Sequence, residues 1–508
     1  MDTRIRNSSI LKKVMSPREA SLLIKDGMNV ATSGFTPSGY PKAIPLALVE
    51  RLKESGEKIR IGLLTGASVG DELDGLLARE NFVAKRYPYQ TNNHMRKNIN
   101  DGLCEYADIH LSHFPQYVKF GFVGKVDLAI IEAVAITEEG NIIPSTSIGC
   151  SPTFVEMADK VIIEINLSQP LELEGMADIY TLNNPPYRQP IPLTKPDDRI
   201  GTPYIPCPIE KIAAVVLTDI PDNVRPLSDI DQVSKQISEH LIDFLKNEVK
   251  AGRLPENLLP LQSGVGSVAN AVLAGLKESD FTDLVCYSEV IQDSILDLIE
   301  AGKVKIASGS SLTPSAEGLQ KFNENIKFFR DKLIFRPQEI SNHPEIIRRL
   351  GIIGINTAIE ADIYGNVNST NIMGSRMMNG IGGSGDFARN AYISIFTTAS
   401  TAKNGDISSI VPMVSHHDHT EHDVMVIVTE QGYADLRGLS PKERAQVVIE
   451  NCAHPDYKPL LWDYFNRAMK GKFKHTPHIL KEALSWHQRM AETGTMKTDK
   501  KEEEHKAS

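Results

Sequence analysis

Short apolar runs alternate along this chain with longer stretches in which apolar residues recur every three or four positions. The runs at 161–165 and 212–217 are rich in β-branched residues, which suits strands buried on both faces. We predict strands at residues 30–34, 59–64, 127–132, 161–165, 212–217, 284–288, 304–307, 391–396 and 424–429. Strands that alternate with helices predict an α/β fold with mainly parallel sheets.

Capping signals place several helix starts. Residues 16–19 (SPRE) and 440–443 (SPKE) each carry the serine and glutamate of a capping box, with proline at the first helical position. The first of these helices is predicted to end at residues 26–27, an Asp-Gly pair. A longer helix is predicted at 232–249.

Size and local composition predict two domains. The chain has 508 residues, of which 41% are hydrophobic and 24% charged, enough for two full cores. Residues 181–208 are rich in proline and are predicted to form an irregular excursion within or beside the first domain. Residues 219–231 have the composition of a linker, so we predict an N-terminal domain at 1–225 and a C-terminal domain at 226–508. The polar end, 497–508, is predicted to be a disordered tail.

Charge, cysteine content and hydropathy exclude several classes of function and location. A net charge of −10 without a basic stripe argues against binding to nucleic acid. The five cysteines are far apart and form no CxxC pair, so neither a disulfide framework nor a zinc site is indicated. The first residues lack the apolar core of a signal peptide, and no apolar run approaches the ~20 residues of a membrane span. We therefore expect a cytoplasmic protein that does not bind membranes.

Glu289 is the strongest candidate for chemistry. It follows the predicted strand 284–288 and precedes a segment with apolar residues at helical spacing. A carboxylate at the tip of such a strand faces the edge where open α/β sheets bind ligands, which suits a nucleophile or general base. The alternative is an acid that merely stabilises a helix N-terminus, a contribution of about 0.3–1 kcal/mol.

Two glycine-rich segments are candidates for ligand contact. Residues 264–269 fit G-x-G-x-x-[GA], and Glu289 lies about 20 residues later, as in dinucleotide-binding folds. This NAD alternative is weakened because Pro260 makes 258–263 a poor central strand. The second segment has four glycines at 380–385, which lets its backbone approach a ligand closely and present N–H donors.

Three further features have simpler interpretations. Asn342 is interpreted as the cap of a helix that runs to Leu350, with Glu345 completing the box. The histidine-rich run 415–423 has no metal-site spacing and is interpreted as a solvated loop. Glu430 ends an apolar strand, as Glu289 does, and can be a plain strand-end acid.

Four motifs resemble a known family. They are Gln262–Gly266 (QSGVG), Tyr287–Asp293 (YSEVIQD), Asp362–Thr370 (DIYGNVNST) and Met378–Phe387 (MNGIGGSGDF). They are similar to class I CoA-transferases of the acetyl-CoA hydrolase/transferase family, and within it to the bacterial succinyl-CoA:acetate branch. The resemblance covers nearly the whole chain and is more specific than the glycine motif that indicates an NAD enzyme.

The resemblance implies two open α/β domains with the active site in the cleft between them, in a homodimer. It implies that Glu289 forms an acyl anhydride and then a CoA thioester, with ping-pong kinetics. The Asn342 side chain and the Gly383 N–H are the implied oxyanion donors. No cofactor is bound permanently, since coenzyme A and acyl-CoA are substrates. The implied CoA contacts are Gly264, Val265, Gly266, Ser267, Val268, Ile359, Asn379, Gly383 and Lys403.

Two positions bear on the choice of carboxylate substrate. Glu430 matches the family, which has an acid beside the carboxylate pocket, whereas Asn223 departs from it. Close relatives have an arginine where this chain has Asn223, and Arg225, two positions on, is the candidate to bind a dicarboxylate. We predict a CoA-transferase that acts on succinyl-CoA, or another short acyl-CoA, and acetate. The alternatives are an acetyl-CoA hydrolase, an NAD-linked oxidoreductase and a non-catalytic CoA-binding protein.

Overall fold

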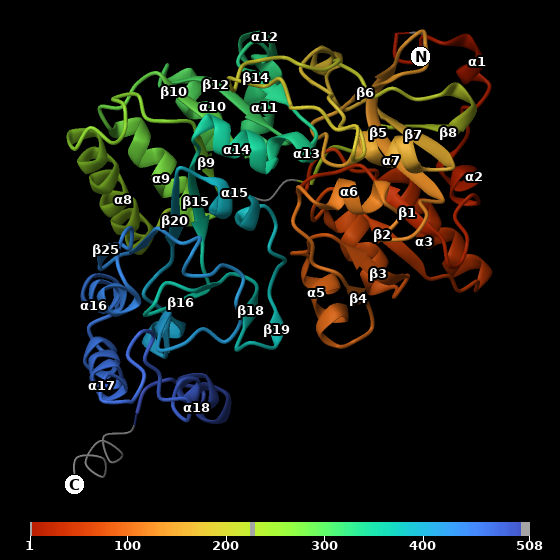
Figure 1. Ribbon diagram of the computed structural model, residues 1–508. Coiled ribbons are helices and arrows are strands. Elements are labelled where there is room, and N and C mark those ends of the chain that lie inside the picture. Colours follow the sequence, from red (N-terminus) through yellow and green to blue (C-terminus); the bar gives the residue numbers. More distant parts are fainter. Residues whose placement is uncertain (1–2, 224–228, 499–508) are drawn as a thin grey trace.

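Two eight-stranded sheets organise the molecule, one in each half of the chain (Figure 1). The computed structural model describes residues 3–223 and 229–498. In Figure 1 the red-to-yellow N-terminal half lies beside the green-to-blue C-terminal half, and the blue helices at the end of the chain extend below the second sheet. The predicted α/β class with mainly parallel sheets is confirmed.

The first sheet has the strand order β4-β3-β2-β1-β5-β7-β8, and β6 pairs with β5. All its pairs are parallel except β5–β6. Its strands are β1 (Asn29–Thr32), β2 (Ile61–Leu64), β3 (Val83–Tyr87), β4 (Glu105–Tyr106), β5 (Leu128–Ile136), β6 (Ile142–Pro144), β7 (Lys160–Asn166) and β8 (Ile212–Thr218). The five strands predicted in this half all form, within a few residues at each end.

The second sheet has the order β14-β12-β10-β9-β15-β20-β24-β25, and only β24–β25 is antiparallel among its described pairs. The carboxyl ends of the central strands therefore lie at one edge, where α/β sheets bind ligands. Its strands are β9 (Leu261–Ser263), β10 (Leu284–Tyr287), β12 (Val304–Gly309), β14 (Leu333–Phe335), β15 (Ile353–Thr357), β20 (Ile393–Thr397), β24 (Val426–Thr429) and β25 (Gly432–Asp435).

Helices connect and cover these strands. Those of the first half are α1 (Ser8–Leu11), α2 (Pro17–Ser21), α3 (Ala43–Ser55), α4 (Leu76–Arg79), α5 (Asn93–Asn100), α6 (Phe114–Lys119) and α7 (Ser151–Met157). Those of the second half are α8 (Gln232–Lys250), α9 (Ser267–Glu278), α10 (Asp293–Glu300), α11 (Ala316–Glu324), α12 (Ile326–Phe329), α13 (Gln338–Ser341), α14 (Pro344–Leu350), α15 (Ser384–Asn390), α16 (Pro441–Cys452), α17 (Lys458–Ala468) and α18 (Ser485–Thr493). Both predicted capping boxes form, at α2 and α16.

Two local predictions were wrong. The helix that begins at Pro17 ends at Ser21 rather than at residues 26–27. The segment after Pro260 forms β9, which lies between β10 and β15 in the middle of the sheet. Pro260 is tolerated because it stands just before the strand, where its carbonyl accepts the N–H of Ile353 at 2.9 Å and no N–H is needed.

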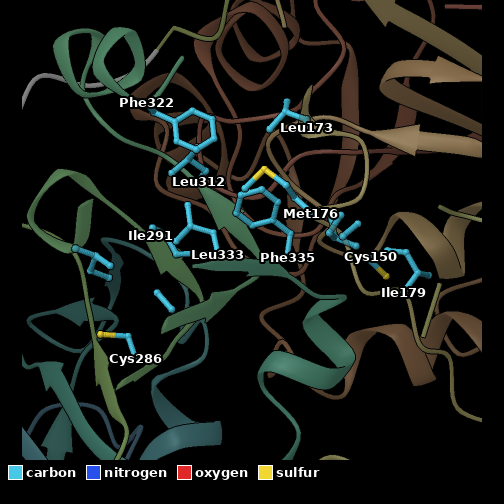
Figure 2. Packing of buried hydrophobic residues seen from close by; sticks show 14 of the residues in the cluster. Cys150, Leu173, Met176, Ile179, Cys286, Ile291, Leu312, Phe322, Leu333 and Phe335 are labelled. Carbon is cyan, nitrogen blue, oxygen red and sulfur yellow. The ribbon is translucent and has the colours of Figure 1, made fainter. Parts of the chain in front are cut away.

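The hydrophobic core is continuous between the two halves. Figure 2 shows Leu173 and Met176 of the first half together with Leu312 and Phe335 of the second, in one cluster of buried side chains. The backbone joins them too, because Phe335 donates its N–H to the Met176 carbonyl at 3.1 Å. This packing fixes the two sheets relative to each other and so fixes the walls of any site between them.

The proline-rich segment 181–208 lies over the second half. Leu182, Ile191 and Leu193 are buried in a cluster with residues of α13 and α14. Arg349 of α14 donates to the carbonyls of Ile191 and Leu193 at 2.8 and 2.9 Å. The segment has no helix or strand, as predicted, but it packs on the second half of the chain and does not lie only within or beside the first domain.

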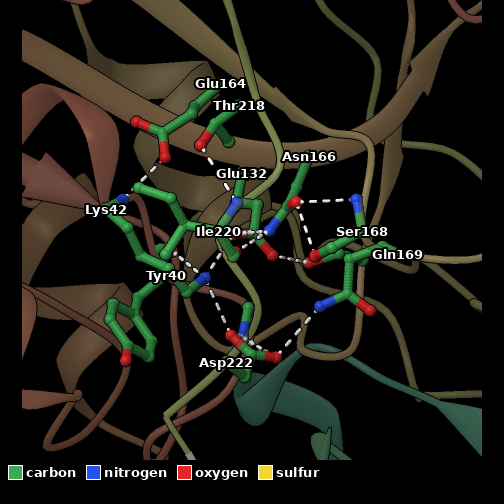
Figure 3. A network of polar contacts seen from close by, with 12 residues as sticks. Tyr40, Lys42, Glu132, Glu164, Asn166, Ser168, Gln169, Thr218, Ile220 and Asp222 are labelled. Carbon is green, nitrogen blue, oxygen red and sulfur yellow. Dashed lines mark hydrogen bonds and ion pairs between the residues drawn. The ribbon is translucent and has the colours of Figure 1, made fainter.

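A buried polar network lies at the start of the connection between the halves (Figure 3). Lys42 Nζ lies 2.6 Å from Glu132 Oε2 and 2.8 Å from Asp222 Oδ1, and all three side chains are buried. Asp222 also accepts the N–H of Gly39 at 3.1 Å. The network thereby joins the connecting segment to the loop that contains Phe35 and Thr36. The predicted boundary residues 224–228 and nearly all of the predicted tail lie outside the described residues.

Candidate active site

A cavity of about 310 Å³ lies between the two halves at the carboxyl edge of the second sheet. The first half contributes Phe35, Thr36, Ala67, Tyr89 and Leu111 to its walls. The second half contributes three loops that follow β9, β10 and β15, together with residues 379–384. A second cavity of about 200 Å³ adjoins it and shares the residues Thr36, Tyr89, Val265 and Val290.

Glu289 faces the larger cavity. It stands between β10 and the short strand β11 (Val290–Ile291), and its own carbonyl accepts the N–H groups of Ser310 and Ser311 at 2.7 and 3.1 Å. The preceding residue, Ser288, is buried and donates its hydroxyl to the Ser263 carbonyl at 3.2 Å. These bonds fix the backbone of Glu289, so its half-buried side chain is presented to the cavity by a rigid support.

Two residues enclose one carboxylate oxygen of Glu289. Asn342 donates a hydrogen bond from Nδ2 to Oε1. Gly383 lies against the same oxygen, and a Cβ at this position would overlap both Oε1 and Asn342 Nδ2. Glycine is therefore required at 383 for steric reasons, independently of its backbone conformation. The three residues that the resemblance assigned to catalysis are in contact.

Burial raises the pKa of Glu289 to about 7. The hydrogen bond from Asn342 lowers this pKa, and the nearby carboxyl of Asp386 raises it. A carboxylate with no cation among these neighbours is poorly stabilised, which favours its use as a nucleophile.

The interpretation of Asn342 as a helix cap was wrong. His343 caps α14, its Nδ1 accepting the Glu345 N–H at 3.2 Å. Asn342 instead ends α13 and is fully buried, with its amide directed at Glu289. The amide is thus available for chemistry because the neighbouring histidine takes the capping role.

The glycine segment 380–385 is fixed by the first half of the chain. Ile381 donates its N–H to Asp108 Oδ2 at 2.8 Å, and Gly380 donates its N–H to the Gln90 carbonyl at 3.3 Å. A Cβ at Gly380 would overlap the Tyr106 hydroxyl. The close approach of the two halves therefore explains the lack of a side chain at this position.

The histidine-rich run is a loop, as interpreted, but it is not solvated throughout. His419 is fully buried, and its Nε2 lies 3.1 Å from the hydroxyl of Ser384 and 3.2 Å from that of Ser369. Asp418 accepts the N–H of Ser369 at 2.7 Å. Burial lowers the pKa of His419 to about 3, so it is neutral at pH 7. Because Ser369 and Ser384 line the cavity, this run supports one of its walls.

Only some of the residues predicted to contact CoA line the two cavities. Gly264, Val265, Ile359, Asn379 and Gly383 line the larger cavity, and Gly266 lines the adjoining one. Ser267 and Val268 form the first turn of α9, next to these lining residues. Gly266 has φ +106°, a conformation that favours glycine.

Lys403 and Glu430, both described, lie outside the residues that line the two cavities. Lys403 is exposed in the loop after β21 (Thr401–Ala402). Glu430 follows β24, four strand spacings or about 19 Å from β10, and accepts the Ser400 N–H at 2.8 Å. Asn223 is exposed, and Arg225 lies outside the described residues.

Sequence reasoning missed two residues beside Glu289. Asp386 accepts a bond from Asn342, and Ser112 of the first half donates to Asp386. Asp386 belongs to the motif Met378–Phe387, but Ser112 carried no signal, because its role depends on how the halves pack.

Among the described residues, no group of three or more His, Cys, Asp or Glu side chains is arranged to hold a metal ion. Helices among the same residues are too short or too polar to cross a membrane.

Comparison with known proteins assigns the family. A model of the acetyl-CoA hydrolase/transferase N-terminal domain matches residues 1–217, and one of the C-terminal domain matches 318–465. A succinyl-CoA:acetate CoA-transferase of Clostridium kluyveri is 62% identical over 98% of this chain and 92% of its own length. The chain belongs to the acetyl-CoA hydrolase/transferase family.

Another relative is named for a different activity. An acetyl-CoA hydrolase of Candida glabrata is 48% identical over 98% of this chain and 97% of its own length. Among solved structures, RipA from Yersinia pestis has a TM-score of 0.71 and 22% identity, covering 91% of this chain and 98% of that one, a likeness of fold. The resemblance predicted from the four motifs is confirmed, and the family is one of enzymes that act on CoA thioesters.

Proposed function

We propose that this enzyme moves CoA between succinyl-CoA, or another short acyl-CoA, and acetate, through a thioester of CoA with Glu289. The observation that carries the proposal is the contact of Glu289, Asn342 and Gly383 at the wall of a cavity between the halves. The succinyl-CoA:acetate relative, at 62% identity, supports the choice of substrates.

In the first step, a carboxylate oxygen of Glu289 attacks the thioester carbonyl carbon. The carbon–sulfur bond breaks, CoA leaves as its thiolate, and an acyl-glutamyl anhydride remains. The thiolate then attacks Cδ of Glu289, which releases the first carboxylic acid as its anion and leaves CoA bound to Glu289. Acetate reverses these steps and departs as acetyl-CoA, so no atom is lost and no oxidant is needed.

Asn342 and Gly383 stabilise the oxyanions of these attacks. The Asn342 amide already donates to a Glu289 oxygen, and the Gly383 N–H precedes the first turn of α15. A preorganised donor of this kind contributes about 3–4 kcal/mol to transition-state stabilisation. The loop Gly264–Gly266 and the first turn of α9 then contact CoA, where backbone N–H groups favour anions.

Water is the alternative acceptor, and a relative named as an acetyl-CoA hydrolase supports it. Water would attack the glutamyl thioester and release free CoA. The two activities are separated by measuring acyl-CoA loss with and without acetate. A transferase requires acetate, whereas a hydrolase does not.

We also propose that the enzyme is a homodimer. Size-exclusion chromatography with light scattering tests this.

The direct test is intact-protein mass spectrometry after incubation with succinyl-CoA alone. We expect an increase by the mass of CoA less one water, because the thioester replaces a carboxylate oxygen, and we expect digestion to map it to the peptide that contains Glu289. The Glu289→Ala variant should show no increase. A wild-type enzyme that turns over without any adduct, or with one on another residue, would contradict the mechanism.

A further inference from the structure

Asp386 is a buried acid that the steps above do not use. It lies in the first turn of α15, three residues after Gly383, and the residue is 4% exposed. The helix dipole favours an acid at such a position. The two carboxylate oxygens, however, are directed at residues outside α15, on α13 and in the first half of the chain.

The contacts of Asp386 form a chain that ends at Glu289. Ser112 donates its hydroxyl to Oδ1 at 2.6 Å and its backbone N–H to Oδ2 at 3.0 Å. Asn342 donates from Nδ2 to the same Oδ2 at 3.4 Å, while its other Nδ2 hydrogen goes to Glu289 Oε1. The Asn342 oxygen accepts the Ser341 hydroxyl at 2.8 Å.

These contacts determine which way the amide of Asn342 faces. Both N–H groups point at carboxylates and the oxygen points at a hydroxyl donor. A flipped amide would place its oxygen between Glu289 and Asp386, which are both acceptors when ionised. The amide could then no longer donate to an oxyanion at Glu289.

We propose that Asp386 is a positioning residue that, anchored by Ser112 of the other half, holds the Asn342 amide in its donating orientation. The inference rests on the proposed function, in which Asn342 stabilises the oxyanion. It makes catalytic geometry in the second half depend on one residue of the first. The feature that matters is the acceptor oxygen that faces both Asn342 and the Ser112 N–H, rather than the negative charge.

The acceptor and the charge can be separated by substitution. In Asp386→Asn, the amide oxygen can accept from Asn342 and the Ser112 N–H, and the amide nitrogen can donate to the Ser112 hydroxyl. We expect kcat within about threefold of wild type. In Asp386→Ala both acceptors are lost, and we expect kcat to fall about 10–100-fold, part of the full effect of a lost oxyanion donor. CoA affinity, measured by calorimetry, should change less than about twofold in both.

A double-mutant cycle tests whether Asp386 acts through Asn342. Asn342→Ala alone should lower kcat by about 10²–10³. Adding Asp386→Ala to it should lower kcat no further than about threefold, because the group to be positioned is gone. Fully additive losses, or Asp386→Asn as slow as Asp386→Ala, would overturn the proposal.

Three further measurements keep the outcome clear. Ser112→Ala removes one hydrogen bond to Asp386 and should lower kcat less than Asp386→Ala does. It takes the place of Asp386→Ala as the test if that variant does not fold. Glu317→Ala removes an exposed acid from the first turn of α11 and should leave kcat unchanged. A crystal structure of Asp386→Ala should show the Asn342 amide turned away from Glu289. An unchanged amide overturns the inference even if CoA still attaches to Glu289, whereas failure of that attachment alone overturns the proposed function.

Discussion

The two halves each bury a cluster of carboxylates, but they compensate the charge differently. In the first half, Glu132 and Asp222 share Lys42, and Glu164 accepts three backbone N–H groups at the start of α3. Burial alone would lower the pKa of Lys42, yet Glu132 and Asp222 raise it above its usual value. Burial also raises the pKa of Glu132 to about 7, although Lys42 lowers it. The first cluster therefore differs in its ion pairs and hydrogen bonds, which a stable buried network requires.

In the second half, Glu289 and Asp386 share one neutral amide, that of Asn342. Burial raises the pKa of each carboxyl to about 7. The comparison shows that burial of an acid does not by itself indicate catalysis. A cluster with a paired cation and fixed donors supports the fold, whereas one whose carboxylates form no ion pair leaves an acid available for the proposed attack, at a cost in stability.

The largest effect is expected from removing Glu289, the proposed nucleophile. Glu289→Ala should lower turnover by a factor of about 10⁴ or more, because the covalent route is lost. The fold should persist, since the side chain faces a cavity. Steady-state assays with circular dichroism check both parts, with Glu317→Ala as the control. Turnover retained at more than a few per cent would mean that Glu289 is not the nucleophile.

Removing the cation of the other cluster should affect stability instead. Lys42→Met leaves Glu132 and Asp222 buried without their partner and should lower the free energy of unfolding by about 3–5 kcal/mol. Urea unfolding measures this, and Lys25→Met, at an exposed lysine of the same half, is the matched control. If both variants were equally stable, the paired cluster would not be supporting the fold.

The unpaired cluster should behave in the opposite way. Burial raises the pKa of Glu289 from 4.5 to about 7, so the free energy of unfolding falls as pH rises through that range and stays lowered above it. Glu289→Gln should therefore raise the free energy of unfolding by about 1–3 kcal/mol at pH 8. The gain should fade as pH falls toward 4, where Glu289 is protonated in both the folded and unfolded states. Unfolding curves at several pH values test this, and a gain that grows on acidification would refute it.

The smallest effect concerns the pH dependence of activity. Glu289 must be ionised to attack, so kcat/KM should fall as pH drops below about 7. Glu289 faces Asn342 and Asp386, and Asp386 in turn faces Ser112, Asn342 and Arg389. Asp386→Asn removes a like charge, so the acid limb should move to lower pH. A limb that stays in place or moves upward would show that the two carboxyls do not interact.

Much of the fold could be predicted from local patterns. Apolar runs such as 161–165 and 284–288 become buried strands because parallel strands between helices have no exposed face. A central strand at 258–263 was not predicted, because it would contain Pro260. Whether proline is tolerated there depends on whether its position in the sheet requires an N–H donor. Such information lies in the register of the sheet rather than in the sequence.

The site could be predicted to the level of its motifs. Glu289 was found by its place at a strand end, and Asn342 and Gly383 by family resemblance. Ser112, Asp386 and His419 were missed because their roles arise where distant segments meet. His419 stands in the run 415–423 with six other charged or imidazole side chains, yet packing against Ser369 and Ser384 buries it.

The most direct test of the central claim is isotope exchange with half of the substrates. Labelled succinate is incubated with enzyme and unlabelled succinyl-CoA in the absence of acetate, and label is followed into succinyl-CoA. If Glu289 takes CoA covalently, label should enter succinyl-CoA with wild-type enzyme and not with Glu289→Ala. Exchange that occurs only when acetate is also present would contradict a glutamyl intermediate.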